Sequence, residues 1–379
     1  MREPRRVLMV FGTRPEAIKM APLLMSLQAH GGFNAKVCVT GQHREMLDQV
    51  LQVFGITPDY DLDIMRADQS LSSITSSILS KLPPILSEFR PELVLVHGDT
   101  STTFAAGLTS FYAGVKVGHV EAGLRTGNIK SPWPEEANRK LVGVIADFHF
   151  APTEIARKNL LREGVSNSSI FVTGNTVVDA LKMSVRKLDS DPSLVEKYDS
   201  EFPFVVGGKR VILVTGHRRE SFGKGFESIC HALADIAKKY TNVAIVYPVH
   251  LNPKVREPVQ RILGGIDSIH LIEPQQYLPF VYLMTKAELI LTDSGGIQEE
   301  APTLGKPVLV MRNTSERPEA ISAGTAVLVG SDRATISGRV SAYLDSQDLS
   351  NSEAKQNPYG CGDSASRIVS LIAEGLSVT

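Results

Sequence analysis

The stretch Val7-Leu8-Met9-Val10-Phe11-Gly12-Thr13-Arg14-Pro15-Glu16 decides the fold class of this 379-residue chain. Five consecutive apolar residues, then a glycine turn and Pro15, predict a strand buried on both faces that leads directly into a helix. Similar runs recur at Leu93–Val96, Val115–Val120, Val211–Val214, Val243–Val246, Leu289–Leu291 and Val308–Val310. Helical patterns lie between them, such as Ala17–Gln28, Ile74–Phe89, Phe226–Lys239 and Ile297–Leu304. This alternation predicts an α/β fold of parallel sheets with helices on both sides.

A polar stretch in the middle of the chain separates two such series. Residues 187–210 contain two prolines and the pair Gly207-Gly208, and the apolar runs resume at Val211. Prolines and paired glycines interrupt helices and strands, so the chain is expected to cross between halves just before or within this stretch. We therefore expect two Rossmann-like domains, residues 1–175 and 176–360, which also suits the length.

The composition is that of an ordinary globular protein, with 42% hydrophobic, 6% aromatic and 21% charged residues. It excludes a collagen-like fibre and a disulfide-dense mini-protein. The 40 lysines and arginines balance 41 aspartates and glutamates, for a formal net charge of -1. Proteins held to nucleic acid by charge are usually basic, so we expect no nucleic-acid partner. No apolar run approaches the roughly 20 residues that span a bilayer, so we expect no membrane segment.

The N-terminus and the cysteines indicate a cytoplasmic protein. The basic N-terminus resembles the start of a signal peptide, but the apolar run Val7–Phe11 is too short and no small-residue cleavage site follows it. Cys38, Cys230 and Cys361 are far apart and form no CxxC pair. We therefore expect neither a disulfide framework nor a structural zinc site, and a reducing compartment fits best.

Nearly every apolar run ends in a polar turn, and most of these turns contain glycine. Such turns follow Phe11, Val96, Val120, Val214, Tyr247 and Leu291. In open parallel sheets, ligands bind at the carboxyl ends of the strands. Because both halves carry these turns, we expect the functional site in a cleft between two facing domains.

The first turn carries two cations, Arg14 and Lys19, at the start of a helix. The alternative is an ordinary turn with two solvated side chains. Two cations at the positive end of a helix dipole are electrostatically unfavourable unless an anion is present. We therefore favour a phosphate ligand. The turn lacks the GxxxxGK[ST] pattern of a P-loop, and no turn reads GxGxxG, so the sequence does not support a nicotinamide cofactor.

A second turn, Asp293-Ser294-Gly295-Gly296, opens another helix. Ser294 can cap this helix, and the glycines allow a ligand to approach its free N–H groups. Glu300 lies about one turn further on, where a carboxylate can accept two ribose hydroxyls. The alternative is a capped helix with surface acids. The glycine pair beside an acid favours a nucleotide.

Three acids are candidates for proton transfer. Asp99 and Glu121 follow consecutive strands, and Glu135 stands just inside a helix. Taken singly, each is more often a cap or a salt-bridge partner, and acids are common in a first helical turn. Carboxylates gathered in one cleft raise each other's pKa and become candidate acids and bases.

Histidines also stand near strand ends. His217 lies beside two arginines, which suits binding of an anion or protonation of a leaving phosphate, although a lone histidine is usually structural. His97, His119 and His250 are expected to be hydrogen-bonding residues of the wall. Because the sequence has no HxxxH or HxH spacing here, we expect no metal.

These segments together resemble the non-hydrolysing UDP-N-acetylglucosamine 2-epimerases over essentially the whole chain. The strings that carry the resemblance are Phe11-Gly-Thr-Arg-Pro-Glu-Ala-Ile-Lys-Met-Ala-Pro22, His97-Gly-Asp-Thr100, His119-Val-Glu-Ala-Gly-Leu-Arg-Thr126, Trp133-Pro-Glu-Glu-Ala-Asn-Arg139, Thr215-Gly-His-Arg-Arg-Glu220, Tyr247-Pro-Val-His-Leu-Asn-Pro253 and Asp293-Ser-Gly-Gly-Ile-Gln-Glu-Glu-Ala-Pro302. The resemblance implies the two-domain glycosyltransferase-B fold, with a C-terminal helix within residues 361–379 that packs back on the first domain. It also implies a cytoplasmic homodimer that makes UDP-N-acetylmannosamine for bacterial surface polysaccharide, such as enterobacterial common antigen.

The resemblance also implies a role for each candidate residue. The diphosphate is held or protonated by Arg14, Lys19 and His217. Phosphate, ribose and uracil are bound by Ser294, Gly295, Gly296, Glu300 and Phe280. Proton transfer around the sugar is carried by Asp99, Glu121 and Glu135. A second, activating substrate molecule in some relatives implicates Gln42, Glu136, Arg218 and His250. Glu45 and Asp68 depart from that pattern, so we expect such activation to be weak or absent.

The implied reaction needs no cofactor. C2 of UDP-N-acetylglucosamine is not α to a carbonyl, so its proton is not acidic until the C1–O bond breaks. Loss of UDP and of that proton gives 2-acetamidoglucal, and re-addition with protonation from the opposite face gives the epimer. The alternatives are a glycosyltransferase of the same fold, which would need an acceptor groove, and a non-catalytic nucleotide-sugar sensor, which would not need three acids.

Overall fold

A computed structural model describes residues 3–41, 44–66, 69–218, 222–346 and 356–376. The chain divides into two compact units. Unit 1 comprises Met1–Ala180 and Tyr359–Thr379, and unit 2 comprises Leu181–Pro358. Helix α7 (Thr176–Ser190) runs through the first of these boundaries, whereas the sequence placed the domain boundary at residue 175.

Unit 1 is built around a seven-stranded parallel sheet in the order β3-β2-β1-β4-β5-β6-β7. Its strands are β1 (Arg5–Phe11), β2 (Phe33–Val39), β3 (Tyr60–Asp61), β4 (Leu93–His97), β5 (Lys116–Val120), β6 (Phe148–Ala151) and β7 (Ile170–Val172). Its helices are α1 (Arg14–His30), α2 (Arg44–Phe54), α3 (Leu71–Phe89), α4 (Ser101–Tyr112), α5 (Glu135–Ile145), α6 (Glu154–Arg162) and α15 (Ser364–Gly375). The central strands β1 and β4 are buried along most of their length, as continuous apolar runs require.

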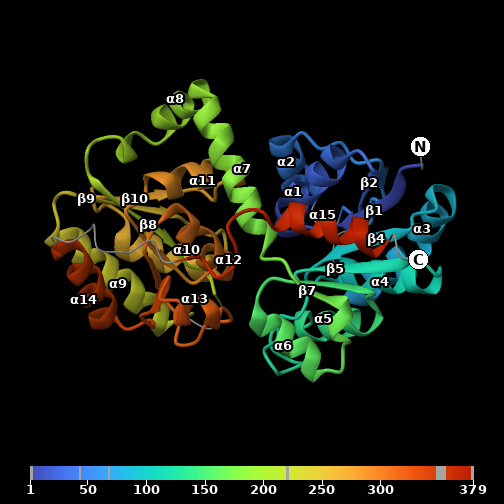
Figure 1. The fold of residues 1–379 in the computed structure, drawn as a ribbon. Coiled ribbons are helices and arrows are strands. Elements are labelled where there is room, and N and C mark those ends of the chain that lie inside the picture. Colours follow the sequence, from blue (N-terminus) through green and yellow to red (C-terminus); the bar gives the residue numbers. More distant parts are fainter. Residues whose placement is uncertain (1–2, 42–43, 67–68, 219–221, 347–355, 377–379) are drawn as a thin grey trace. The chain divides into compact units, whose positions relative to one another are not determined.

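The C-terminal helix belongs to unit 1 although it comes last in the sequence. Figure 1 shows α15, in red, lying beside α1, in blue, and these two helices pack together. At the far end of α15, Nη1 of Arg5 donates a hydrogen bond to the carbonyl of Ala373 over 3.0 Å. Ile368 and Ile372 are fully buried. The last helix therefore completes the core of the first unit.

Unit 2 has a six-stranded parallel sheet in the order β10-β9-β8-β11-β12-β13. Its strands are β8 (Arg210–Thr215), β9 (Val243–Pro248), β10 (Ile269–Ile272), β11 (Leu289–Thr292), β12 (Val308–Val310) and β13 (Ala326–Leu328). Its helices are α8 (Pro192–Glu201), α9 (Lys224–Lys239), α10 (Pro253–Leu263), α11 (Tyr277–Lys286), α12 (Gly295–Glu300), α13 (Pro318–Ser322) and α14 (Arg333–Asp345). The predicted α/β class, with two parallel sheets, is confirmed.

Each sheet has one point at which the strand order reverses. In unit 1 the reversal lies between β1 and β4, and in unit 2 it lies between β8 and β11. Turns at the carboxyl ends of such strands diverge to opposite faces and leave room for a ligand. The strand order thus selects four turns, which begin at Gly12, Gly98, Gly216 and Asp293. Within the described part of the chain, no helix combines the length and apolarity needed to cross a bilayer.

Candidate functional site

In unit 1, a buried carboxylate joins the turns that follow β1 and β4. Glu16 accepts five hydrogen bonds: from the backbone N–H groups of Gly12 and Thr13, and from the hydroxyls of Thr13, Thr100 and Thr103. Burial raises the pKa of the Glu16 carboxyl, while these donors favour its charged form. The network fixes the turn that leads into α1.

Arg14 is the first residue of α1 and is half-buried. The turn before it also demands a glycine, because a Cβ on Gly12 would lie 1.9 Å from Oγ1 of Thr40. Such an approach excludes any side chain at this position. The backbone ahead of Arg14 therefore packs closely against Thr40 and Thr102.

Glu121, directly after β5, is the most constrained of the candidate acids. Its backbone has φ 64°, in the left-handed region that residues other than glycine rarely adopt. Its side chain is 9% exposed and forms an ion pair with Lys19 of α1. Nδ2 of Asn175 donates to its Oε2 over 2.7 Å, and Nε2 of His97 lies 3.8 Å from the same oxygen. Backbone strain at a buried, paired carboxylate is typical of functional positions.

The pairing of Lys19 with Glu121 was not expected, since the sequence assigned Lys19 to the diphosphate. Asn175 was not predicted at all. It follows β7, the last strand of the sheet order, and only the fold brings it to the end of β5. No spacing rule connects residues 121 and 175 in the sequence.

Asp99, two residues after the end of β4, is held by α5. Its side chain forms an ion pair with Arg139, and its carbonyl accepts a hydrogen bond from Nδ2 of Asn138 over 2.9 Å. Arg139 also contacts Glu136 over 3.3 Å. Arg139 was missed as a candidate residue; it lies three residues after Glu136 on α5, and that spacing was the available signal for their ion pair.

Glu135 and Glu136 are adjacent in α5 but differ in environment. Glu135 begins the helix, is half-buried, and its Oε2 is buried with no hydrogen-bond partner among the described residues. Glu136 is completely buried and accepts hydrogen bonds from the backbone N–H groups of Thr126 and Gly127, each over 3.1 Å. Glu135 therefore keeps a carboxylate oxygen without a hydrogen-bond partner among the described residues, whereas Glu136 holds a loop.

In unit 2, Asp293 joins the turns after β8 and β11. Its Oδ2 accepts hydrogen bonds from the backbone N–H groups of His217 and Arg218, each over 2.7 Å. Its Oδ1 lies 3.5 Å from Nδ1 of His217. Burial lowers the pKa of His217, while the Asp293 carboxylate acts in the opposite direction. The His217 ring also stacks on His250, with centroids 5.3 Å apart.

A buried acid thus holds the backbone of His217 and lies beside its ring, while the His217 side chain remains 42% exposed, so a ligand can reach it. The sequence did not assign a role to Asp293. The neighbouring position of β8 and β11 in the sheet produces this contact, and that adjacency is invisible in the sequence.

The glycine pair after Asp293 begins α12. Ser294 occupies the N-cap position, but its side chain makes no capping hydrogen bond, so the predicted cap is wrong in its side-chain role. A Cβ on Gly295 would lie 3.6 Å from Cζ of Arg317, which places a guanidinium beside the pair. Gly295 is buried against this guanidinium, which is itself ion-paired with Glu299, and Gly296 is half-buried.

Glu300 and Phe280 lie on helices of the same unit. Glu300 ends α12, is largely buried, and accepts a hydrogen bond from Oη of Tyr277 over 2.9 Å. Tyr277 begins α11, and Phe280 is one turn further along that helix and half-buried. Because Tyr277 ties α11 to α12, an aromatic ring and a carboxylate are held on adjoining helices, as a nucleoside site requires.

Two residues assigned to a second substrate molecule, Arg218 and His250, lie on the turns after β8 and β9. Nη1 of Arg218 is 4.0 Å from Oε1 of Glu316, and Nδ1 of His250 accepts a hydrogen bond from the backbone of Asn252 over 3.1 Å. Gln42 and Asp68 lie outside the residues that the structure describes.

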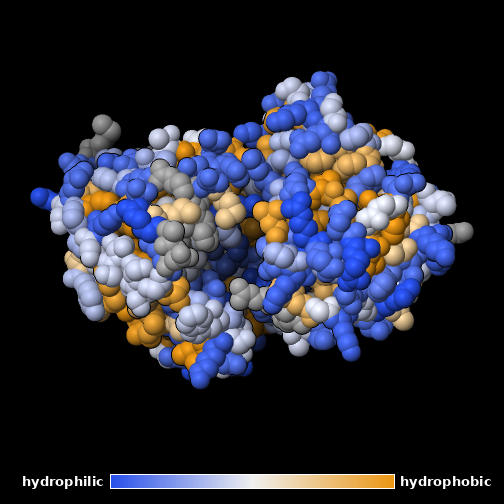
Figure 2. Space-filling view, turned by 180° about the vertical axis from the view of Figure 1, so that it is seen from behind, coloured by the Kyte–Doolittle hydropathy of each residue, from blue (hydrophilic) through white to orange (hydrophobic). Residues whose placement is uncertain are grey.

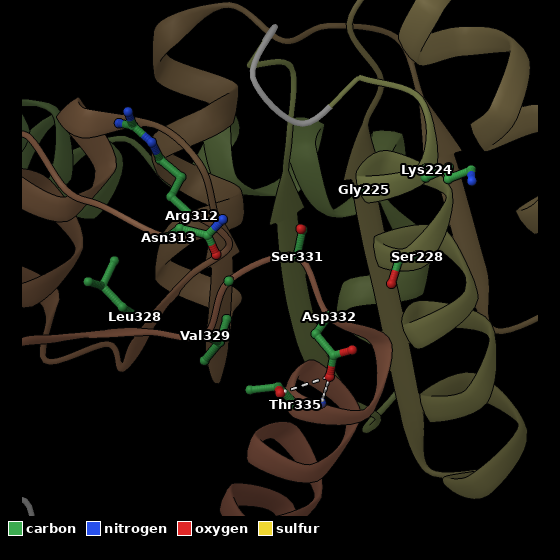
Figure 3. Close-up of a pocket in the computed structure, with 11 residues that line it drawn as sticks. Lys224, Gly225, Ser228, Arg312, Asn313, Leu328, Val329, Ser331, Asp332 and Thr335 are labelled. Carbon is green, nitrogen blue, oxygen red and sulfur yellow. Dashed lines mark hydrogen bonds between the residues drawn. The ribbon is translucent and has the colours of Figure 1, made fainter.

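A cavity of about 640 Å³ lies at another part of unit 2, between the start of α9 and the turns after β12 and β13. Figure 3 shows that Arg312 points away from Ser331 and Asp332, and that Asp332 is bound to Thr335. Arg312 instead approaches Glu316 over 3.3 Å. None of the candidate site residues lines this cavity. The cavity is therefore not assigned to the candidate site.

Comparisons with known proteins agree on one family. Residues 25–373 match the family model described as UDP-N-acetylglucosamine 2-epimerase. The chain is 60% identical to the UDP-N-acetylglucosamine 2-epimerase of Escherichia coli K12 over 97% of its own length and 98% of the relative's, and 60% identical to that of Salmonella typhimurium over the same shares.

Solved structures agree with the sequence relatives. A crystal structure of the UDP-GlcNAc 2-epimerase from Neisseria meningitidis, bound to UDP-GlcNAc, has a TM-score of 0.90 and 53% identity, and covers 97% of this chain and 100% of that one. The UDP-GlcNAc 2-epimerase of Methanocaldococcus jannaschii, in complex with UDP-GlcNAc and UDP, has a TM-score of 0.81 and 32% identity, and covers 98% of this chain and 100% of that one.

Proposed function

The chain belongs to the UDP-N-acetylglucosamine 2-epimerase family, and we propose that it interconverts UDP-N-acetylglucosamine and UDP-N-acetylmannosamine by inversion at C2. The observation that carries the proposal is the pair of acids at the ends of neighbouring strands. Asp99 follows β4 and Glu121 follows β5, and each is ion-paired with a cation. A sensor of nucleotide sugars would have no use for a strained, paired carboxylate.

The reaction begins with cleavage of the C1–O bond. The electron pair of that bond leaves with the β-phosphate of UDP, and the sugar acquires oxocarbenium character at C1. This charge makes the C2 proton acidic, and a carboxylate removes it to give 2-acetamidoglucal. In the return step, UDP adds to C1 and a proton is delivered to the opposite face of C2. Proton delivery to both faces requires at least two acid–base groups.

The candidate residues divide between these steps. Arg14 and His217 bind the diphosphate, and His217, oriented by Asp293, protonates or stabilises the departing phosphate. Lys19 stabilises the ionised form of Glu121 and also binds the diphosphate. The proton transfers at C2 belong to Asp99, Glu121 and Glu135.

UDP binding belongs to unit 2. The backbone of Gly295 and Gly296, with Ser294, contacts phosphate, and Glu300 accepts the ribose hydroxyls. The ring of Phe280 lines the uracil pocket. No NAD and no metal take part in the proposed reaction.

A second substrate molecule is expected to have little effect on the rate. Arg218 and His250 are proposed to contact an anion, but Glu136 is completely buried and accepts hydrogen bonds from backbone N–H groups. Glu45 adds an exposed negative charge. Initial rates should therefore follow a hyperbola in UDP-N-acetylglucosamine, and a sigmoidal curve would show that activation occurs.

The oligomer is proposed to be a homodimer formed through α4 and α5. Figure 2 shows a mostly hydrophilic surface interrupted by groups of hydrophobic residues. Phe111 and Tyr112 of α4 are 54% and 75% exposed, and Leu141 and Val144 of α5 are 49% and 83% exposed, on two helices that pack together. Exposed apolar residues on packed helices favour a contact with a second copy. Val144→Glu should yield a monomer by light scattering; an unchanged mass would contradict this interface.

The proposed compartment is the cytoplasm, and the proposed product feeds bacterial surface polysaccharide such as enterobacterial common antigen. The cysteines support a reducing compartment, because they are few, far apart and form no CxxC pair. Burial raises the pKa of Cys38 and Cys230 to about 12. Thiols of such pKa are unreactive.

Product analysis tests the proposed function. The protein is incubated in heavy water with UDP-N-acetylglucosamine alone, without NAD or added metal, and the sugar is followed by NMR. We expect UDP-N-acetylmannosamine with deuterium at C2. A glycosyltransferase would form no epimer without an acceptor, and a sensor would return the substrate unchanged. An epimer that keeps its original C2 proton would instead indicate hydride transfer.

A further inference from the structure

The chain passes between the two units twice. Hydrogen bonds connect both passages to the same short segment of unit 1, residues 174–179. The first passage is α7, and the second is the step from Pro358 to Tyr359. The backbone N–H of Asn175 donates to the carbonyl of Tyr359 over 2.8 Å. One turn into α7, Asp179 accepts hydrogen bonds from the backbone N–H groups of Ser364 and Ala365 over 3.3 and 3.0 Å.

Close packing reinforces this junction. Gly174 has φ 84°, and a Cβ built on it would lie 2.5 Å from Oγ of Ser364 and 2.9 Å from the carbonyl oxygen of Tyr359. A side chain there would force the two passages apart. The segment from residue 174 to residue 179 therefore holds both passages at fixed positions on unit 1.

The side chain of Asn175 links this junction to the candidate acid Glu121. Its Oδ1 accepts a hydrogen bond from the backbone N–H of Val177 over 3.0 Å, and its Nδ2 donates to Oε2 of Glu121 over 2.7 Å. Asn175 is only 2% exposed. The amide orientation follows from chemistry, because the carboxylate can only accept and the backbone N–H can only donate.

We propose that Asn175 is a positioning residue for Glu121. Through its hydrogen bonds, the position of this carboxylate depends on the junction of the two chain passages. The inference rests on the proposed function, in which Glu121 transfers a proton at C2. Lys19 supplies charge through a long, flexible side chain. Asn175 supplies a short, neutral and buried donor that is fixed at both ends.

A neutral donor has a chemical advantage over a second cation. It fixes Oε2 without adding a positive charge that would further weaken Glu121 as a base. Oε1 faces Gly98, where a Cβ would lie 3.8 Å away. Lys19 from α1 and His97 from β4 are titratable groups that contact Glu121, and Asp99 lies two residues after His97. None of these groups replaces the fixed donor.

Two substitutions separate positioning from helix capping. Asn175→Ser keeps a side chain that caps α7 but is too short to reach Glu121. It should lower kcat by 10-fold to 100-fold while the dissociation constant of UDP stays within twofold. Asn175→Asp keeps the size and the cap but places a second carboxylate against Glu121. It should lower kcat at pH 7 by at least 10-fold and move the acidic limb of the kcat profile upward by about one pH unit.

A matched control removes a cap elsewhere in unit 1. Thr153 caps α6 by accepting a hydrogen bond from the backbone N–H of Ala156 over 3.1 Å, and is not among the candidate site residues. Thr153→Ala should lower the melting temperature and leave kcat and its pH profile as in the wild type. A wild type that forms no epimer would refute the proposed function itself. If the wild type is active and Asn175→Ser keeps a kcat within twofold of it, the positioning role is overturned. If Asn175→Asp does not fold, the result with Asn175→Ser alone decides.

Discussion

Acidification from pH 7 to pH 5 should destabilise unit 1 strongly, because three histidines are buried there in neutral form. His97, His119 and His149 are 3%, 1% and 1% exposed. Burial lowers the pKa of His97 to about 4, that of His119 to about 3 and that of His149 to about 4. A proton therefore binds the unfolded chain, with an ordinary pKa near 6.5, more tightly than the folded one.

The magnitude follows from these values. A folded-state pKa below the unfolded one contributes stability that is present above pH 6.5 and is lost as the pH falls towards the folded value, near pH 4. Each pH unit in that window is worth about 1.4 kcal/mol per group. At pH 5 the loss is about 2 kcal/mol per histidine, or about 6 kcal/mol for the three from pH 7. Ordinary carboxylates titrate below this window, and domains are stable by only about 5–15 kcal/mol.

The assay is unfolding in urea at pH 7 and at pH 5. Unfolding is detected by pulsed hydrogen exchange and mass spectrometry of peptides from β4, β5 and β6. These peptides report on unit 1 separately from unit 2. His149→Gln should reduce the loss of unfolding free energy between the two pH values by about 2 kcal/mol, because one titrating group is gone.

The exposed His231 of α9 provides the control, and His231→Gln should leave the loss unchanged. If the loss in His149→Gln equals that of the wild type, the acid sensitivity does not arise from buried histidines and the reasoning is wrong.

Three further predictions concern the candidate site. Arg14→Ala should weaken UDP binding by about 1–3 kcal/mol, as expected for a charge-assisted hydrogen bond, and calorimetry showing unchanged affinity would refute its placement at the diphosphate. Asp99→Asn, Glu121→Gln and Glu135→Gln should each lower kcat by about 10²-fold to 10⁴-fold while still binding UDP; an amide variant with wild-type turnover would remove its acid from the mechanism. Glu16→Ala should lower the unfolding free energy by about 3 kcal/mol in urea, because the buried donors around it lose their acceptor, and a loss below about 1 kcal/mol would show that water or other groups replace it.

The sequence predicted the local structure closely. The expected strand Val7–Phe11 is observed as Arg5–Phe11, and the expected helix Phe226–Lys239 as Lys224–Lys239. Burial on both faces of a central strand needs a continuous apolar run, and such a run is readable without knowing its neighbours. The helix expected at Ile297–Leu304 ends its α-helical part at Glu300 and continues as a 3₁₀ turn, where Pro302 lacks the N–H that an α-helix would use.

The sequence by itself also determined which chemistry stands at the strand ends, because turn residues and strand ends are local features. The tertiary structure alone decided which of these groups meet. It paired Lys19 with Glu121 and Arg139 with Asp99, placed Asn175 against Glu121, and set Asp293 behind His217. The physical reason is that strands that are neighbours in a parallel sheet need not be consecutive in the sequence. Which strands pair depends on how the crossover connections pack in the folded chain. Apolar periodicity records whether a residue is buried, but it carries no information about which residue is buried against it.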